Sequence, residues 1–585
     1  MRQFFITVIG VVVGLIAFFV LLILILVGFG MLGAAGQAMA PKPEQVLSLD
    51  MRDGLPDHGL GDTLFGPSNG VVDIVRALDS AKTDDRIKGL FIRADSTGLA
   101  PASAEELRLA ILDFKSSGKF VIAHAQGFES PTLFPFMTVA GADELWIQDT
   151  TGFAVSGLYS ETEFFGGVMD KIGANPEFEQ FYEYKNAVNT YTQETFTDAH
   201  REATTSYLTS LYDSAIGHIA EDRNMDIDAV KAVLNSAPHS AEDALASGMV
   251  DKLGHIEAAK AYVKLKAGGE TTAMIPIQNY KPNTPLTGPT LAYIGGQGAI
   301  LPGPSSSGGP FGGSVTIGGD TLAEAFDNAI KDDNVKAIVF RVSSPGGSPA
   351  ASDQILAAAE RAQEAGKPVV ISMGQYAASG GYYISATADK IVAMPTTVTG
   401  SIGVYGGKIA LEDTFAKVGY NVEGITVGGD YAGAFSSDTP FTDSQREAYQ
   451  GQLEDIYEDF TGRVALGRDI PLSRVKEIAK GRVWTGEQAK ELGLVDELGG
   501  FMKAVEVAKE LAEIKPEEKI RLKRFPRALT PAEQIEKLFT GTAQMQSDIA
   551  ALRKITALPE VQAALRAREA GRMGQEMKAE LPEIQ

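Results

Sequence analysis

The segment Asp84–Arg93, with the sequence Asp-Asp-Arg-Ile-Lys-Gly-Leu-Phe-Ile-Arg, occurs twice in the chain in closely similar form. Its counterpart, Asp332–Arg341, reads Asp-Asp-Asn-Val-Lys-Ala-Ile-Val-Phe-Arg and begins 248 residues later. In both copies a charged turn precedes a run of apolar and β-branched residues that is typical of a buried strand. A match of this length indicates an internal repeat.

Three more pairs of segments recur in the same order, at spacings of 248 or 245 residues. The pairs are Gly118-Lys119 with Gly366-Lys367, Phe196–Asp198 with Phe441–Asp443, and Val250–Gly254 with Val495–Gly499. Four matching blocks in one order, at nearly constant spacing, predict that the chain is a tandem duplication.

Short apolar runs alternate with helical segments inside each copy. In the second copy the expected strands are Ala337–Val342, Val369–Met373, Lys390–Ala393 and Ile402–Tyr405, and the expected helix is Ser352–Ala365. This alternation favours an α/β fold with layers of helix and sheet, parallel strands and right-handed crossovers.

The segment Phe4–Leu32 contains no charged residue. As a helix it would be about 44 Å long, enough to span a bilayer core of about 30 Å with some tilt. A cleaved signal peptide is the alternative, because Ala38-Met39-Ala40 resembles a cleavage site, but this apolar run is about twice the usual length. We therefore expect one transmembrane anchor. The flanking charges, Arg2 against Lys42 and Arg52, leave its orientation open.

These features divide the chain into five predicted parts. They are an N-terminal membrane anchor (1–40), a first repeat (41–265), a connector with a flexible loop (266–315), a second repeat (316–515) and a helical C-terminal extension (516–585).

Composition excludes several classes of function. The net charge of −23 disfavours binding to nucleic acid, because phosphate backbones are repelled. The absence of cysteine excludes disulfides, thiol nucleophiles and zinc sites built on cysteine. No His-Glu-x-x-His motif occurs, so a zinc peptidase of that type is also excluded. We expect no metal and no cofactor.

Two glycine-rich segments of the second copy, Ser344–Ser348 and Ala377–Gly381, each lie between a predicted strand and a predicted helix. A serine at such a turn lies at the carboxyl edge of the sheet, near helix N–H groups that stabilise an oxyanion. Flanking glycines let a substrate approach the backbone closely. Two ordinary turns are the alternative interpretation, and composition alone does not separate the two. The Gly-x-Ser-x-Gly motif of α/β-hydrolases is absent.

Three motifs, Arg341–Ser348, Ala377–Tyr382 and Thr399–Gly403, resemble the signature of the signal peptide peptidase A (protease IV) family. The resemblance covers about residues 45–515 and includes the N-terminal anchor. It implies that each repeat has the crotonase-like fold shared with the Clp protease. Ser343 departs from the family, which more often has Asn there, and we expect little consequence from it.

The resemblance also implies roles for individual residues. Ser379 would be the nucleophile, a lysine the general base, and Ser401 the serine that positions that lysine. The expected oxyanion donors are the backbone N–H groups of Gly346 and Gly380, with Gly347 as the alternative to Gly346.

The repeat identifies the lysine. The position 248 residues before Ser379 is Pro131, so the first copy lacks the nucleophile. Conversely, Tyr184-Lys185 in the first copy aligns with Tyr431-Ala432 in the second, which lacks the lysine. Each copy therefore keeps one half of a Ser379–Lys185 dyad, and the site is predicted to form where the copies meet.

A lysine can serve as a base at neutral pH only if burial lowers its pKa. We therefore predict that Lys185 is desolvated and hydrogen-bonded to Ser379 and Ser401. Alternatively, Lys185 is an ordinary surface lysine, and Lys408 is the base within one repeat. His200 aligns with a glutamine of the second copy and is expected on a helix surface.

The resemblance implies a peptidase that digests released signal peptides and other short apolar peptides. It further implies a homotetramer in the bacterial inner membrane, held in the lipid by the N-terminal helix, with the catalytic part in the periplasm. A catalytically silent membrane scaffold and an acyl-CoA enzyme of the crotonase type are the alternatives; the Ser379, Lys185 and Ser401 set disfavours both.

Overall fold

The computed structural model describes residues 44–527, except 53, 60, 64–65, 96–97, 282–286 and 308–313, together with Glu533. The predicted anchor, Phe4–Leu32, lies outside these residues, and so do nearly all of the residues of the predicted C-terminal helices. None of the helices within the described ranges is both long and apolar enough to cross a bilayer.

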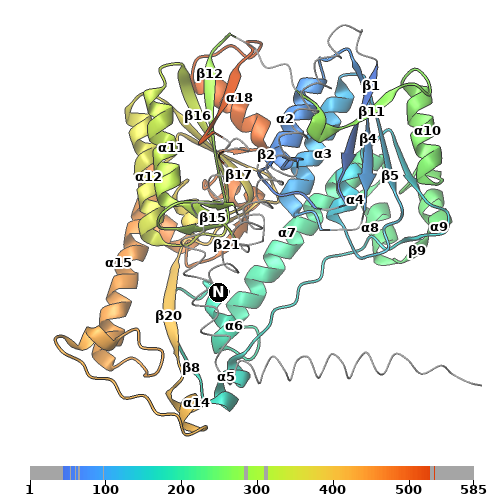
Figure 1. The fold of residues 1–585 in the computed structure, drawn as a ribbon. Helices are drawn as coiled ribbons and strands as arrows, with labels where there is room; N and C mark the ends of the chain where they lie inside the picture. Colours follow the sequence, from blue (N-terminus) through green and yellow to red (C-terminus); the bar gives the residue numbers. More distant parts are fainter. Residues whose placement is uncertain are drawn as a thin grey trace, which may run out of the picture.

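The first half of the chain forms a six-stranded parallel sheet in the order β10-β6-β5-β4-β1-β11. Its strands are β1 (Gln45–Asp50), β4 (Ile87–Ala94), β5 (Phe120–Ala125), β6 (Glu144–Ile147), β10 (Lys252–Leu253) and β11 (Ala273–Pro276). Helices α2 (Val71–Ala81) and α3 (Pro101–Ser116) cover one face, and α10 (Ile256–Lys266) covers the other (Figure 1).

The second half forms a sheet with the corresponding strand order, β22-β18-β17-β16-β12-β23. Its strands are β12 (Thr290–Gln297), β16 (Val335–Ser344), β17 (Val369–Ala378), β18 (Lys390–Ala393), β22 (Glu497–Leu498) and β23 (Arg521–Phe525). The end of β17 also pairs with β19 (Val398–Gly400), which pairs with the antiparallel β21 (Val483–Thr485). Helices α11 (Gly319–Lys331) and α12 (Pro349–Glu364) cover one face, and α18 (Phe501–Leu511) covers part of the other.

The shared strand order supports the predicted duplication and the mixed α/β class with parallel sheets. We call the two halves the first repeat (β1 to β11) and the second repeat (β12 to β23). The structure differs from two predicted boundaries. The range 266–315, expected to be a connector, contains β11 and β12, and the range 516–585, expected to be helical, begins with β23. Both β11 and β23 are short edge strands with mostly exposed or half-buried residues, so neither produces a buried apolar run in the sequence.

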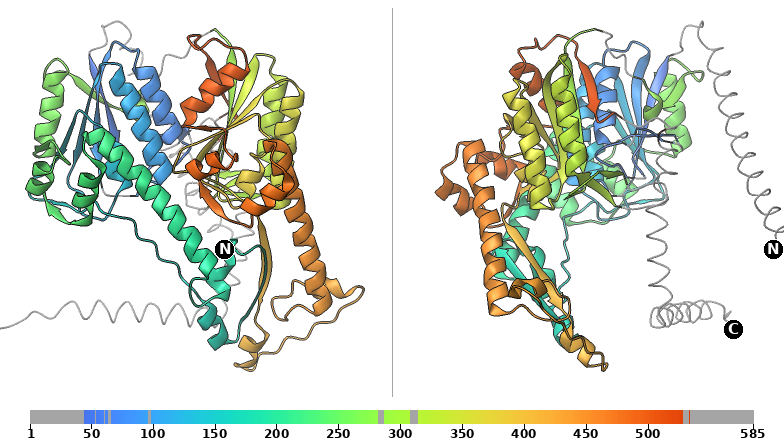
Figure 2. Two further views of the ribbon diagram at one scale, coloured as in Figure 1. Left: turned by 180° about the vertical axis from the view of Figure 1, so that it is seen from behind. Right: turned by 60° about the vertical axis from the view of Figure 1, so that its left-hand side comes forward.

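The repeats stack face to face. Across the molecule, Figure 1 shows α11 and α12, the second sheet, then α18 beside α2 and α3, then the first sheet, and finally α10. Figure 2 shows the same layers from two other sides. An apolar cluster between the repeats joins Val72 of α2 to Phe501 of α18 and to Tyr293 and Val339 of the second sheet. The two repeats therefore share one internal layer.

Below the sheets, one strand from each repeat joins a two-stranded antiparallel ladder (Figure 1). Strand β8 (Asn175–Phe181) pairs along its whole length with β20 (Val404–Ala410). Two long helices, α7 (Asp198–Arg223) and α15 (Asp443–Arg468), descend with it. Their N-caps, Thr197 and Thr442, are the threonines of the repeated Phe-Thr-Asp motif, and each accepts a backbone N–H three residues on.

A buried ion cluster ties the repeats together. Arg341 of β16 is 1% exposed, and its guanidinium donates to Asp57 (2.5 Å) and Glu106 (2.6 Å), both from the first repeat. It also donates to Ser372 of β17 (3.0 Å). Burial alone would lower the pKa of Arg341, but the charges of Asp57 and Glu106 outweigh it and raise the pKa above its ordinary value.

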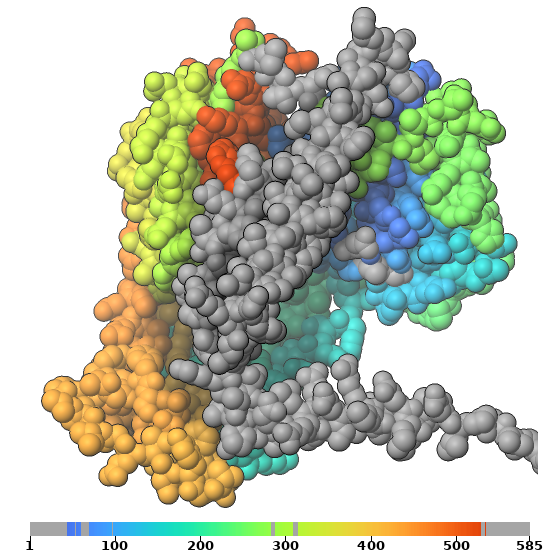
Figure 3. Space-filling model, in the orientation of Figure 1, coloured from blue at the N-terminus to red at the C-terminus, as the bar shows by residue number. Residues whose placement is uncertain are grey.

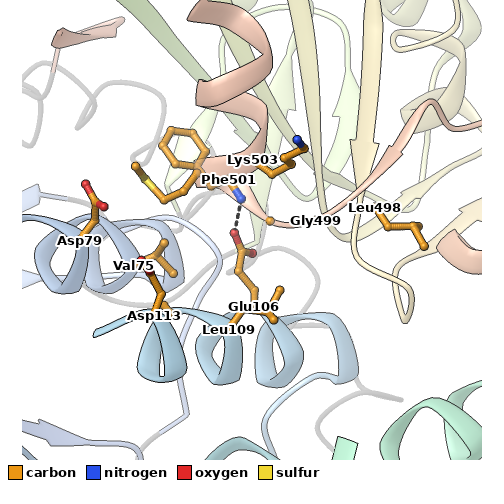
Figure 4. A pocket seen from close by; sticks show the side chains of 12 residues that line it. Val75, Asp79, Glu106, Leu109, Asp113, Leu498, Gly499, Phe501 and Lys503 are labelled. Carbon is orange, nitrogen blue, oxygen red and sulfur yellow. Dashed lines mark hydrogen bonds between the residues drawn. The ribbon is translucent and has the colours of Figure 1, made fainter. Parts of the chain in front are cut away.

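Glu106 makes a second contact with the second repeat. Its carboxylate accepts the backbone N–H of Phe501 (2.5 Å), the first residue of α18. Figure 4 shows this bond at the wall of a cavity of about 300 Å³ between α2, α3 and the start of α18. A carboxylate at a helix N-terminus is favoured by the free N–H groups and the helix dipole. Glu106 therefore binds both the sheet and a helix of the second repeat.

Replacing Arg341 by Met should lower the free energy of unfolding by about 3–5 kcal/mol, because two carboxylates stay buried without their cation. Urea denaturation followed by circular dichroism measures the change. The matched control is Arg361→Met, which removes a half-exposed pair with Asp327 (2.8 Å) and should cost less than about 1 kcal/mol. Equal losses for the two variants would contradict a structural role for the cluster.

Candidate active site

Ser379 lies at the sharp turn between β17 and the short helix α13 (Gly380–Tyr383). Its backbone has φ 54° and ψ −120°, a conformation that a residue with a side chain rarely adopts. The turn is held by the Ser379 N–H, which donates to the Gly400 carbonyl (2.9 Å). The hydroxyl is thereby presented at the carboxyl edge of the second sheet.

Lys185 comes from the first repeat, in the loop that follows β8. Its side chain is 4% exposed, and its Nζ lies 3.1 Å from the Ser379 Oγ. Nζ also lies 3.0 Å from the Ser401 Oγ and donates to the Ser401 carbonyl (2.9 Å). The structure therefore brings together the three side chains singled out in the sequence, and they come from two repeats.

The β8–β20 ladder explains how the two chain segments meet. Phe181, at the end of β8, pairs with Val404, at the start of β20. Lys185 follows Phe181 by four residues, and Ser401 precedes Val404 by three. The ladder therefore places the lysine loop next to the segment between β19 and β20, which carries Ser401.

Burial is the cause of the unusual acid–base state of Lys185. It lowers the pKa of this lysine from 10.5 to about 7. No charged side chain contributes to this shift, and hydroxyl and carbonyl oxygens surround the amine. Near neutral pH a large fraction of the amine is therefore unprotonated and can accept a proton.

The glycine turn Gly346-Gly347 lies against the start of α13. A Cβ at Gly346 would be 2.7 Å from the Gly380 nitrogen, so only glycine allows this approach. The Gly346 N–H donates to the Ser344 hydroxyl (3.1 Å). Within the described residues, no acceptor is found for the N–H of Gly347 or of Gly380.

The other candidates have different surroundings. Lys408 donates to the carbonyls of Ser436 (3.0 Å) and Thr439 (2.6 Å) and lies over the ring of Phe441. Lys408 therefore stabilises the position of the segment 436–439, which precedes α15. His200 packs edge-on against Phe196 in the first turn of α7. Within the described part of the chain, no group of His, Asp and Glu side chains is arranged to hold a metal ion.

Two further residues near Lys185 were not identified from the sequence. Gly481 contacts the backbone of Lys185, and Arg482 packs against Tyr184 and pairs with Glu202 of α7. One signal could have revealed them. The repeats match before and after this point, but the segment Lys480–Thr485 (Lys-Gly-Arg-Val-Trp-Thr) has no likeness to its counterpart, Asn235–Ser240 (Asn-Ser-Ala-Pro-His-Ser).

Comparison with known proteins identifies similar chains. The model of peptidase family S49 matches two segments of the chain. Residues 113–269 lie in the first repeat, and residues 361–515 lie in the second. The chain is 33% identical to Protease 4 of Salmonella typhi, in an alignment covering 85% of this chain and 83% of that protein. It is 29% identical to Protease 4 of Haemophilus influenzae, covering 84% and 83%. It is also 29% identical to the chloroplastic serine protease SPPA of Arabidopsis thaliana, covering 77% and 67%.

Replacing Lys185 by Met should stabilise the protein at neutral pH. Between pH 10.5 and 7 the unfolded chain binds a proton that the folded protein excludes, so burial of this amine costs stability as the pH falls through that range. Each pKa unit is worth about 1.4 kcal/mol, so the expected gain at pH 7 is about 3–5 kcal/mol, vanishing above about pH 10.5.

Urea denaturation of both proteins at pH 7 and pH 10 measures this gain. Lys336→Met, at an exposed lysine, is the control and should change stability by less than about 0.5 kcal/mol at either pH. A Lys185→Met protein no more stable than wild type at pH 7 would contradict the lowered pKa.

Proposed function

The chain belongs to peptidase family S49 and is a serine peptidase, and on this premise we propose that Ser379 is its nucleophile and Lys185 its general base. The observation that carries the proposal is the distance of 3.1 Å between the Lys185 Nζ and the Ser379 Oγ. This is the separation that proton transfer needs. The lowered pKa of Lys185 supplies an amine able to take the proton near neutral pH.

The reaction follows from these positions. The Lys185 amine takes the hydroxyl proton as the Ser379 oxygen attacks the peptide carbonyl, giving a tetrahedral oxyanion. The resulting ammonium returns the proton to the leaving amine, and an acyl-enzyme ester remains. Lys185 then takes a proton from water as the water oxygen attacks the ester carbonyl. The ammonium returns that proton to the Ser379 oxygen as the ester bond breaks and the acid leaves. Ser401 holds the amine from its other side throughout.

We assign the oxyanion contacts to the N–H groups of Gly347 and Gly380. The sequence favoured Gly346 over Gly347, but the Gly346 N–H already donates to Ser344. A Cβ at Gly380 would lie 3.1 Å from the Gly347 nitrogen, so the two N–H groups are near neighbours. Two donors aimed at one point are the usual arrangement for a developing oxyanion.

The proposed substrates are released signal peptides and other short apolar peptides. Support comes from the apolar segment Phe4–Leu32, which would hold the enzyme at the bilayer in which such peptides accumulate. Anchoring raises the effective concentration of membrane-bound substrates. We accordingly propose a single-pass protein of the bacterial inner membrane with its catalytic part in the periplasm.

We further propose that the protein is a homotetramer. Support comes from the segment 418–427, which projects at the lower end of the molecule (Figure 3). Its apolar side chains are largely exposed, including Val418 (79%), Ile425 (93%) and Val427 (88%). Apolar side chains exposed to this extent favour an interaction site, and we assign this segment to contact with other copies of the chain.

Ser379→Ala and Lys185→Ala should each lower kcat/KM for an apolar fluorogenic peptide by at least about 10³-fold, because either change removes the activated nucleophile. Lys408→Ala should stay within a few-fold of wild type. In the wild type, kcat/KM should rise with pH through about 7 as the amine loses its proton. A serine-directed fluorophosphonate should label Ser379 with the same pH dependence.

Normal turnover by Lys185→Ala would overturn the assignment of the base. Absence of both turnover and labelling in the wild type would instead indicate a catalytically silent scaffold.

Replacing Ile425 and Val427 together by Asp should reduce the oligomeric state, because charges would be placed in the proposed contact. Light scattering coupled to size-exclusion chromatography measures the mass of the detergent-solubilised protein. The control is Leu265→Asp, on α10 of the first repeat and away from the segment 418–427. The Leu265 side chain is 64% exposed, and its replacement should leave the mass unchanged. A tetramer that survives the double substitution would refute this interface.

A further inference from the structure

The turn Lys480–Arg482 lies in the second repeat between α16 (Leu472–Ile478) and β21. Lys480 has φ 54° and Gly481 has φ 80°, so two successive residues adopt the left-handed conformation. Such a conformation is unfavourable for lysine and persists only where the surroundings hold it in place. The contacts of this turn show what holds it.

On one side the turn binds the lysine loop of the first repeat. The Lys480 carbonyl accepts the N–H groups of Tyr182 and Tyr184, both at 3.2 Å. Gly481 packs directly on Lys185: a Cβ at this position would be 2.6 Å from the Lys185 Cβ and 2.7 Å from its backbone nitrogen. The absence of a side chain at residue 481 is therefore what allows Lys185 to occupy its place.

On its other side the same turn binds the segment between β19 and β20, which contains Ser401. The Arg482 carbonyl accepts the Ser401 N–H (2.7 Å), and the Gly481 N–H donates to the Ile402 carbonyl (2.8 Å). Three consecutive residues therefore hold both the amine and one of the two hydroxyls that face it. They fix the position of one relative to the other.

The Arg482 side chain adds a third point of attachment. Its guanidinium lies 4.9 Å from the ring centre of Tyr184 and 4.3 Å from that of Trp484, and it donates to Glu202 of α7 (2.8 Å). Tyr184 directly precedes Lys185. The arginine therefore clamps the lysine loop against the second repeat and pairs with a helix of the first.

The first repeat lacks these features. The segment corresponding to Lys480–Arg482 is Asn235–Ala237, which contains no glycine and no arginine. The residue corresponding to Lys185 in the second repeat is Ala432. The turn is thus present only in the repeat that must receive a lysine from its neighbour.

We propose that the turn Lys480–Arg482 positions Lys185 for the reaction, with Gly481 as its decisive residue. This inference rests on the function proposed above and adds to it the element that sets the separation of Nζ from the Ser379 and Ser401 hydroxyls. Gly481 is a positioning residue, because it contacts the base and not the reacting atoms. Displacements of about 1 Å in such a device can cost about 10²-fold in rate.

Gly481→Ala in the full-length protein tests the inference. The added methyl group should push the Lys185 backbone aside and lower kcat at pH 7 by about 100-fold, while KM should change less than about three-fold because substrate contacts stay intact. The matched control is Gly493→Ala. Gly493 has φ 77° in the same repeat, but its Cβ would only touch Ile470 at 3.4 Å. It carries the same backbone strain without the contact and should retain kcat within about three-fold.

The pH profile separates positioning from general damage. A displaced Lys185 is less enclosed, so its pKa should rise toward 10.5, and the ascending limb of kcat/KM should move up by about one pH unit or more. The rate deficit of Gly481→Ala should then shrink at high pH. The pH at which an amine-acylating reagent modifies Lys185, followed by peptide mass spectrometry, reports the same shift without relying on turnover.

A second variant keeps the inference testable if Gly481→Ala does not fold. Arg482→Lys keeps the charge near Glu202 but loses the planar contact with Tyr184 and Trp484, and it should lower kcat about ten-fold with a smaller upward shift of the same limb. The inference would be overturned if the variant that folds had the wild-type kcat and the wild-type pH dependence of kcat/KM. Equal losses in Gly481→Ala and Gly493→Ala would overturn it as well. A wild type without turnover would refute the proposed function instead, and the acylation pH would still test the turn.

Discussion

The amine of Lys185 must be shielded from water, and much of the structure around it follows from that constraint. An ammonium group resists transfer out of water, so a protein can bury a lysine at this depth only by giving up its charge. A carboxylate beside it would raise its pKa and keep it protonated at neutral pH, so that it could not accept a proton. The amine is instead surrounded by the Ser379 and Ser401 hydroxyls and one carbonyl. Neutral oxygen atoms orient the lone pair without favouring the proton.

Two repeats are needed to enclose this amine. The lysine loop leaves the first repeat, and the second repeat supplies the oxygen atoms and the turn that covers its backbone. The repeats are joined at several other places, among them the β8–β20 ladder and the cluster of Arg341 with Asp57 and Glu106. A site divided between two bodies is only as well ordered as the contact between them. Buried ion pairs are suited to that task, since they tolerate little change in geometry.

The sequence predicted the duplication, three strands of the second sheet (β16, β17 and β18) and the proximity of Ser379 and Lys185. The pairing could be predicted because the two copies lack complementary residues: Pro131 stands in place of the serine, and Ala432 stands in place of the lysine.

The edge strands β11 and β23 were missed because short, half-exposed strands produce no buried apolar run. The role of Gly481 was missed for another reason: close contact between segments 296 residues apart, at a glycine, has no signature in composition or periodicity. The sequence favoured Gly346 over Gly347 as an oxyanion donor, but that choice depends on where the Ser344 hydroxyl points.

The division of the site between the two repeats has a consequence during synthesis of the chain. Lys185 and Ser379 are separated by 194 residues, and the turn at Lys480 and the edge strand β23 come later still. During translation Lys185 is synthesised long before Ser379, and Ser379 is synthesised before the turn at Lys480 that holds the lysine loop. A chain that is still being synthesised therefore lacks the complete Ser379–Lys185 arrangement, and with it the proposed catalytic centre, until its synthesis is almost finished.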